Sequence, residues 1–313
     1  MYNRLQFINV DSREVARDLF SSSVTAVHIE SSSYCNRRCS YCPISTVDRI
    51  SSINYISDEN FEKILSGLSE ISYSRHLSLS IFNEPLADRH YIARRIRQVR
   101  LALPQAIVYL NTNGDYLDAG YLDELAELGV REMYITLHPA REAIYDDAKI
   151  ARRFEEFQDR TTLDLSDMGI IPGVRRDART HWKGIAIRVF SVNYTDHGQT
   201  RGGLMKNVAV PDLRTSPCDR PFADFTVSYT GDVFPCCQLF SDSEEHRPYR
   251  VGNIADADIF TLYTSAMMVG FRRHLFVDGP KLPPCDRCTE GTPECTAAQM
   301  AERRRLLDGV DRS

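Results

Sequence analysis

The chain has 313 residues, of which 42% are hydrophobic and 26% are charged, a composition typical of a folded protein and unlike that of disordered or collagen-like chains. Lys and Arg total 38 against 43 Asp and Glu, which gives a formal net charge of −5. This balance excludes the broad cationic surface with which proteins bind nucleic acids or acidic membranes. A small neutral or polar substrate suits it better.

The amino terminus, MYNRLQFINVDSREV, has no basic stretch followed by an apolar core, so it does not resemble a secretory signal. No apolar run approaches the roughly 20 residues that span a bilayer. We therefore expect a cytoplasmic protein with no membrane partner. In that reducing compartment, nine cysteines indicate thiolate ligands or reactive thiols rather than disulfides.

Between about residue 24 and residue 190, short apolar or β-branched runs alternate with amphipathic stretches, which is typical of a parallel sheet with outer helices. The predicted strands are Val24 to Ile29, Leu77 to Phe82, Ile107 to Leu110, Met133 to Leu137 and Ile185 to Phe190. The predicted helices are Asp58 to Leu68, Tyr91 to Leu103, Tyr121 to Leu128 and Arg141 to Phe157, with Ser57 as the cap of the first.

The composition changes after Phe190, where Gly, Asn, Asp and Pro become common. Phe225 to Tyr229 is predicted as a strand before a turn at Thr230-Gly231-Asp232, and Thr296 to Leu307 as an amphipathic helix. We expect an N-terminal extension (1–23), an α/β domain (24–205) and a small C-terminal domain (206–313).

The first cysteine group, Cys35, Cys39 and Cys42, has the spacing C-x3-C-x2-C just after the first predicted strand. Parallel α/β folds place their chemistry at this end of the strands. Three thiolates are one short of the four that close an iron–sulfur cluster, so one iron would stay open to another ligand. A zinc site would usually add a second ligand pair, and none follows within twenty residues of Cys42. The group therefore favours an iron–sulfur cluster.

This motif, with Tyr41 before its third cysteine, resembles that of the radical S-adenosylmethionine (SAM) superfamily. Ile81-Phe82-Asn83-Glu84-Pro85 after the second strand is similar to the superfamily's GGE-type motif, whose carboxylate suits the amino group of SAM. Asn111-Thr112-Asn113-Gly114 after the third strand is similar to its TNG element. The resemblance implies a partial (β/α)6 TIM-like barrel with one SAM-binding 4Fe-4S cluster. The implied SAM contacts are Tyr41, Asn83, Glu84 and Asn113, with His138 as a contact to SAM or substrate.

The second cysteine group lies in the predicted C-terminal domain and comprises Cys218, Cys236, Cys285 and Cys288. Its spacing, with G-x4-C ending at Cys236 and C-x2-C at Cys285, is similar to the twitch domain, a shortened SPASM domain built from a β-hairpin and a helix. The resemblance implies that these four cysteines fully ligate an auxiliary 4Fe-4S cluster. Cys237 and Cys295 are left without a role as ligands.

Within the superfamily the chain resembles twitch-domain dehydrogenases that oxidise a secondary alcohol of an aminocyclitol. The resemblance implies an oxidoreductase that removes hydrogen from a small polar metabolite through a 5′-deoxyadenosyl radical, with electron outflow to the auxiliary cluster. The substrate would be an amino sugar, an aminocyclitol or a nucleoside-like alcohol, and an external flavodoxin- or ferredoxin-type protein would supply electrons. Arg201, in an Arg-Gly-Gly element, would contact a substrate hydroxyl. The segments Thr161 to Thr200 and Ser241 to Pro248 are longer than expected, so the substrate itself does not carry over.

Cys237 leaves alternatives open. It could be an inert packing residue, could replace Cys236 as a ligand, or could donate a hydrogen atom to the substrate radical. The last role, which Cys295 could also take, would make the enzyme an epimerase. A maturase of a ribosomal peptide is a third possibility, although about thirty residues before the cluster motif are few for a leader-recognition domain. A non-enzymatic iron–sulfur or zinc protein would be separated from all of these by its metal content and by SAM cleavage.

Overall fold

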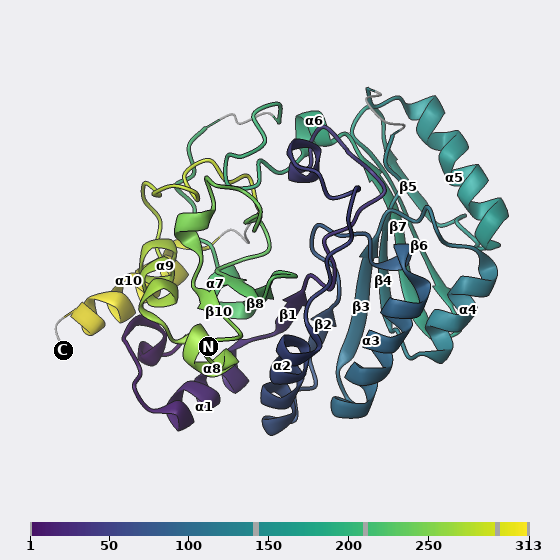
Figure 1. Ribbon diagram of the computed structural model, residues 1–313. Coiled ribbons are helices and arrows are strands. Elements are labelled where there is room, and N and C mark those ends of the chain that lie inside the picture. Colours follow the sequence, from purple (N-terminus) through teal and green to yellow (C-terminus); the bar gives the residue numbers. More distant parts are fainter. Residues whose placement is uncertain (1, 140–143, 209–211, 292–294, 312–313) are drawn as a thin grey trace.

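The computed structural model describes residues 2–139, 144–208, 212–291 and 295–311. Its strands form one ten-stranded sheet in the order β10-β9-β8-β1-β2-β3-β4-β7-β6-β5. Figure 1 shows this sheet curving around a central space, with the large helices on its outer side. The strands are β1 (Ala26–Ile29), β2 (His76–Ser78), β3 (Ile107–Thr112), β4 (Glu132–Thr136), β5 (Met168–Ile171), β6 (Arg175–Trp182), β7 (Ile185–Val192), β8 (Asp224–Val227), β9 (Asp232–Phe234) and β10 (Gly252–Asn253).

Six neighbouring strands run parallel, in the order β8, β1, β2, β3, β4 and β7. The helices outside them each begin after a Ser or Asp whose side chain accepts a hydrogen bond from the first turn, including the predicted cap Ser57. These helices are α2 (Asp58–Glu70), α3 (Arg89–Ala102), α4 (Ala119–Glu127) and α5 (Asp147–Thr161). Parallel strands with outer helices confirm the predicted partial (β/α)6 barrel.

The start of α5 differs from the prediction, which began this helix at Arg141. Residues 141–143 lie outside the described residues, and residues 144–146 are not helical. Asp146 caps the helix through its side chain, which accepts a hydrogen bond from the backbone of Lys149. The helix therefore begins at Asp147, one residue after its cap.

Strands β5 and β6 were not predicted. They lie in the long segment before β7, and β6 pairs antiparallel with both β5 and β7. The sequence of β6, RRDARTHW, buries only Ala178, so it lacks the alternation of apolar residues by which a strand is recognised. The segment Thr161 to Thr200 therefore extends the edge of the barrel sheet.

Strand β8 joins the two predicted domains. It pairs parallel with β1, with Ala26 opposite Asp224, so the sixth parallel strand lies beyond the predicted boundary at residue 206. The predicted turn after it leads directly into β9. Gly231 in this turn has φ +85°, and a Cβ atom there would lie 2.4 Å from Nδ2 of Asn60. Glycine is therefore required where the turn meets α2.

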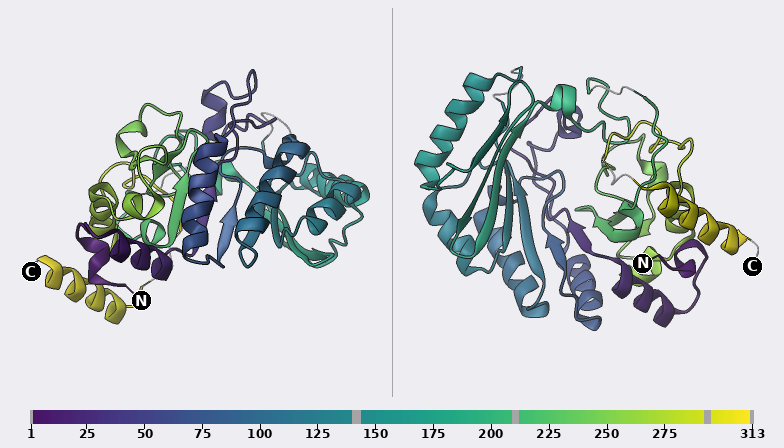
Figure 2. Two further views of the ribbon diagram at one scale, coloured as in Figure 1. Left: turned by 60° about the horizontal axis from the view of Figure 1, so that its bottom comes forward. Right: turned by 180° about the vertical axis from the view of Figure 1, so that it is seen from behind.

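The N-terminal residues pack on the C-terminal part of the chain, as both views of Figure 2 show. Phe20 on α1 makes edge contacts with Phe225, Phe260 and Tyr263. Phe7 packs with Phe222, Phe276 and Val310. The remaining helices are α1 (Arg13–Ser23), α6 (Tyr194–His197), α7 (Arg220–Ala223), α8 (Ile259–Tyr263), α9 (Ala266–Leu275) and α10 (Ala297–Asp311), with short 3-10 helices at Arg4–Phe7, Pro43–Thr46, Pro85–Ala87 and Arg247–Tyr249. The predicted closing helix is thus α10.

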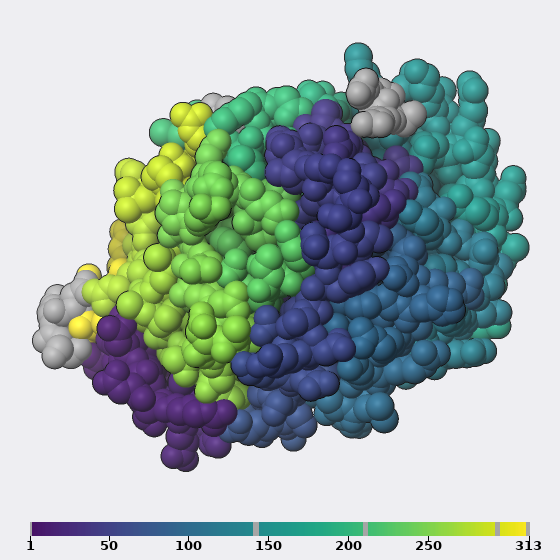
Figure 3. Space-filling model, in the orientation of Figure 1, coloured from purple at the N-terminus to yellow at the C-terminus, as the bar shows by residue number. Residues whose placement is uncertain are grey.

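A buried ion-pair network joins the segment after the first cysteine group to the C-terminal part. Arg49, 2% exposed, donates to Glu30 at 2.6 Å and to Asp242 at 2.8 Å, and its guanidinium lies 4.4 Å from the Phe240 ring centroid. Figure 3 shows the dark blue segment near residue 50 packed directly against the green C-terminal part. In the described part of the chain, no helix is long and apolar enough to cross a membrane.

Candidate active site

The first cysteine group lies at the carboxyl end of β1 and faces a cavity of about 730 Å³ inside the curved sheet. Cys35, Cys39 and Cys42 are all partly exposed and all line this cavity. Their loop is fixed by Arg37, whose guanidinium makes a two-pronged ion pair with Asp115 at 2.6 and 2.7 Å. The three thiols therefore face open space from one braced loop.

Glu84 lies buried beside the loop of the first cysteine group, in the segment that follows β2. Its carboxylate accepts hydrogen bonds from Thr112 Oγ1 at 2.6 Å and from the backbone N–H groups of Asn113 and Leu86 at 2.7 and 3.0 Å. Burial raises the pKa of Glu84 to about 7, although these hydrogen bonds favour the ionised form. The carboxylate lines the cavity, so a cation bound there would lower its pKa again.

The two predicted asparagines form hydrogen bonds within the loops around Glu84. The Asn83 amide donates to Ser31 Oγ at 3.2 Å and its oxygen accepts from the backbone N–H of Ile81. The Asn113 amide donates to Asn36 at 2.7 Å and lies 3.9 Å from Cys35 Sγ. Both residues line the cavity, and Asn113 links the third strand to the first cysteine group.

An aromatic wall closes one side of the cavity. Tyr41 Oη lies 2.8 Å from Nδ1 of His138, and the Tyr41 ring stacks on Tyr194 of α6 with centroids 4.9 Å apart. Burial lowers the pKa of His138 to about 3, so its imidazole is neutral at physiological pH. Tyr194 was missed in the sequence because a single tyrosine in a polar loop gives no pattern.

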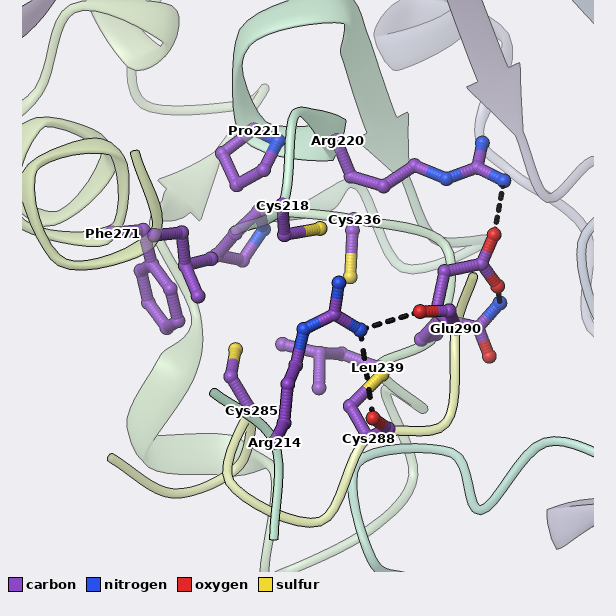
Figure 4. Close-up of a pocket in the computed structure, with 13 residues that line it drawn as sticks. Arg214, Cys218, Arg220, Pro221, Cys236, Leu239, Phe271, Cys285, Cys288 and Glu290 are labelled. Atoms are coloured by element: carbon purple, nitrogen blue, oxygen red, sulfur yellow. Dashed lines mark hydrogen bonds and ion pairs between the residues drawn. The ribbon is translucent and has the colours of Figure 1, made fainter. Parts of the chain in front are cut away.

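The second cysteine group forms a separate, small pocket. Cys218, Cys236, Cys285 and Cys288 all line it, as Figure 4 shows. Arg214 reaches across this pocket and donates to the backbone carbonyls of Cys288, Glu290 and Pro217. The guanidinium thus ties together the loops that carry the first and last cysteines of the group. Cys295 does not line either pocket.

A row of hydrogen-bonded polar side chains separates the small pocket from the large cavity. Arg201 lines the cavity and donates to Gln238 at 2.8 Å, and Gln238 donates to Glu290 at 2.7 Å. Glu290 also accepts from Arg220, at 2.6 Å, and Arg220 lines both pockets. Arg201 has φ +51°, and its buried Nε has no hydrogen-bond partner among the described residues.

Cys237 follows the pocket residue Cys236 but lines the large cavity instead. It lies beside His28 on β1 and Asp224 on β8. His28 Nδ1 is 3.0 Å from the Tyr109 hydroxyl on β3. His28, Asp224 and Tyr109 were not predicted as site residues. A histidine inside an otherwise apolar strand was the available signal for His28.

Both cysteine groups fit iron–sulfur clusters by the chemistry of their donors. The first offers three thiols at a large cavity with the carboxylate of Glu84 nearby, which suits a cluster with one iron open to SAM. The second offers four thiols in one small pocket, which suits a fully ligated cluster. The structure therefore groups the nine cysteines as three, four, and two that stand apart.

Comparison with known protein families matches both parts of this arrangement. The family model described as the radical SAM superfamily matches residues 29–171. The SPASM model, described as an iron–sulfur cluster-binding domain, matches residues 218–289. Each match contains one complete cysteine group.

Individual relatives are distant in sequence but similar over most of their length. The S-adenosyl-L-methionine-dependent 2-deoxy-scyllo-inosamine dehydrogenase of Niallia circulans is 22% identical over 253 residues, covering 80% of this chain and 86% of that protein. The crystal structure of BtrN in complex with AdoMet and 2-DOIA has a TM-score of 0.62 at 19% identity, covering 85% of this chain and 93% of that one. BtrN in an open conformation has a TM-score of 0.57 at 18% identity, covering 85% and 92%. These structures share the fold of this chain.

Proposed function

Because this chain belongs to the radical SAM superfamily and carries a SPASM-type iron–sulfur domain, we propose that it oxidises a secondary alcohol of a small polar metabolite to a ketone. The substrate class is an amino sugar, an aminocyclitol or a nucleoside-like alcohol. Its cofactors are SAM and two 4Fe-4S clusters. When bound, they supply a carbon radical that takes hydrogen from a C–H bond and a one-electron acceptor.

One observation carries the proposal: the large cavity is lined by the first cysteine group, by Arg201 and by Cys237, the residue next to the second group. A substrate in this cavity would lie between the two sites. Cys35, Cys39 and Cys42 would hold the SAM-binding cluster, and Cys218, Cys236, Cys285 and Cys288 the auxiliary one. Glu84, Asn83, Asn113, Tyr41 and His138 would hold SAM.

Arg201 would hold the substrate hydroxyl. Its Nη1 is fixed by Gln238 and its guanidinium lies 5.4 Å from the centroid of the Phe82 ring, so the side chain is held in place before a ligand arrives. Its buried Nε has no partner among the described residues, and an oxygen in the cavity would satisfy it. A charged donor at this position binds the substrate oxygen as negative charge develops on it.

The aromatic wall would keep water from the reacting atoms. Tyr41 stacks on Tyr194, the His138 ring packs at a tilt against both, and the neutral imidazole adds no charge to the site. We further propose the division into residues 24–205 and 206–313 as the catalytic and auxiliary domains. The external reductant would be a flavodoxin- or ferredoxin-type protein.

A second candidate function is epimerisation, and the position of Cys237 favours it. Its side chain lines the large cavity and does not face the pocket of the second cysteine group. A thiol there is placed to return one hydrogen atom to the opposite face of a substrate radical. The sulfur radical left on Cys237 would take one electron from the external reductant and one proton from solvent, so the carbon would be inverted with no net oxidation of the substrate.

The test is anaerobic reconstitution of the whole chain, with iron counted and products followed against a panel of aminocyclitols and amino sugars. About eight irons per chain and a ketone that forms with deoxyadenosine would support the proposal. An inverted product that requires Cys237 would assign the enzyme as an epimerase. Failure to cleave SAM with both clusters present would refute both functions.

A further inference from the structure

Three metal-ligating side chains outside both cysteine groups converge at the wall of the large cavity. One donor atom each from His28, Asp224 and Cys237 lies within 4.8 Å of the other two. His28 and Asp224 are 7% and 4% exposed, and Cys237 lines the cavity. Donors around one zinc ion lie about 3.5 Å apart, so shifts of about 1 Å would bring all three into range.

The His28 imidazole gives a second indication of a bound ion, independent of the distances between the three donor atoms. Nδ1 of His28 lies 3.0 Å from the Tyr109 hydroxyl, which fixes the ring from one side. Nε2 is buried, lies 3.5 Å from Asp224 Oδ2, and has no hydrogen-bond partner with good geometry among the described residues. A buried nitrogen left in this state is unfavourable, and a bound cation would satisfy it.

The neighbouring side chains have the arrangement that supports metal ligands. Metal-binding histidines usually donate their other N–H to a fixed acceptor, and ligating carboxylates are themselves hydrogen-bonded. Tyr109 is placed to accept from His28, and Arg220 holds Oδ2 of Asp224 at 2.9 Å. His28 and Asp224 are therefore each oriented by a residue that does not ligate.

The charge of this region also favours a divalent ion. Arg220 pairs with Asp224 at 2.9 Å, which favours the charged carboxylate although burial opposes it. Arg220 also pairs with Glu290, and Arg201 lines the same cavity, so two negative charges face two positive charges. A thiolate at Cys237 would add a third negative charge, and a divalent cation would neutralise the excess.

We propose that His28, Asp224 and Cys237 bind one divalent transition-metal ion of the zinc class at the cavity wall. Binding releases the Cys237 thiol proton to solvent and changes no oxidation state. Three protein ligands leave a fourth position for an oxygen ligand, as in catalytic zinc sites. This position faces the cavity, so a substrate hydroxyl would bind there and lose its proton more readily.

The role toward the hydroxyl rests on the proposed function, but the metal site itself does not. Zinc binding by Cys237 excludes hydrogen donation by the same residue, because a ligated thiolate carries no S–H bond. Zinc bound with one sulfur ligand at this site would therefore exclude hydrogen donation by this residue.

The experiment loads the reconstituted holoenzyme with Zn²⁺, removes weakly bound ion by desalting, and measures zinc content and the zinc X-ray absorption edge. We expect about one zinc per chain with one sulfur ligand near 2.3 Å and nitrogen or oxygen ligands near 2.0 Å. His28→Ala and Asp224→Asn should each lower zinc affinity 10- to 100-fold or more, with iron content unchanged. Cys295→Ser, a thiol outside both pockets, is the matched control and should retain zinc.

Absence of bound zinc would overturn the proposal, as would an environment of three or four sulfurs, which would place the ion among cluster cysteines. Zinc retained in both His28→Ala and Asp224→Asn would also overturn it. If zinc binds as expected but no alcohol is oxidised, the proposed function fails and the site stands. If chelator-treated enzyme without zinc oxidises the alcohol at full rate, the role toward the hydroxyl fails.

Discussion

The two cysteine groups differ in the space that they face. The first has three thiols at the edge of a cavity of about 730 Å³, and the second has four thiols around a pocket that holds little besides them. A cluster that lacks one protein ligand can bind another molecule only where that molecule can reach the open iron. A cluster with all four protein ligands suits a site that no other molecule enters. This difference fits the proposed function, in which the first group would hold the cluster that cleaves SAM and the second would hold the cluster that accepts an electron.

Removing one thiol from the open group should have the largest effect. Cys39→Ala leaves two protein ligands, so we expect iron to fall from about eight to about four per chain and SAM cleavage to disappear. Iron analysis and deoxyadenosine formation measure this directly. Cys295→Ala should behave as wild type, and SAM cleavage that survives in Cys39→Ala would contradict the assignment of the first group.

Removing one thiol from the closed group should separate the two functions. Cys285→Ala should also lose about four irons, but SAM should still bind and be cleaved because the first group is untouched. Ketone formation should stop, since the electron from the substrate has no acceptor. A variant that forms ketone at the wild-type rate would show that the second group has no part in oxidation.

Arg49 links the two regions, and we expect its removal to lower the free energy of unfolding without removing a metal ligand. Arg49→Ala leaves Glu30 buried without its partner, for which we expect a loss of about 3–5 kcal/mol in unfolding free energy. Thermal unfolding of the reconstituted protein measures it. Arg13→Ala, which removes half-exposed ion pairs with Glu70 and Asp258, should cost much less and serves as the control.

The smallest effect is a pH dependence confined to the open site. The pKa of Glu84 is raised to about 7, so protons compete with the amino group of SAM below that pH. SAM affinity should fall about tenfold for each pH unit below 7 and level off above it. Calorimetric titration from pH 5.5 to 8 measures this change. Glu84→Gln should bind weakly at every pH, and a wild-type affinity that does not vary with pH would contradict the role of this carboxylate.

Local patterns in the sequence predicted much of this arrangement. The cysteine spacings, the apolar strands and the cap Ser57 each depend on residues close together in the chain, and the structure contains them. β6 was missed because four of its first five residues are charged and only Ala178 is buried. The parallel pairing of β8 with β1 was missed because nothing in either segment specifies a partner so distant in sequence.

The chemistry around Cys237 was unpredictable for a related reason. His28, Tyr109 and Asp224 come from three strands, and no local pattern places them together, although a histidine in an apolar strand marked His28. The strand order β8-β1-β2-β3 and its register bring their side chains to one wall. The same holds for Arg49, whose two carboxylate partners flank it in space but come from β1's end and from the segment after Phe240.

The pairing of β8 with β1 also has a consequence for how the chain is made. Thr25 beside β1 bonds to Ala223 beside β8 across 198 residues of sequence. At a synthesis rate of about 5–20 residues per second, the edge of β1 stays uncovered for about 10–40 s on the ribosome. Pairing over so long a loop is slow, and an uncovered apolar edge invites aggregation. Cluster insertion before β8 has docked would find an unfinished barrel, so we expect the C-terminal part of the chain to be needed before the first cysteine group can hold a cluster.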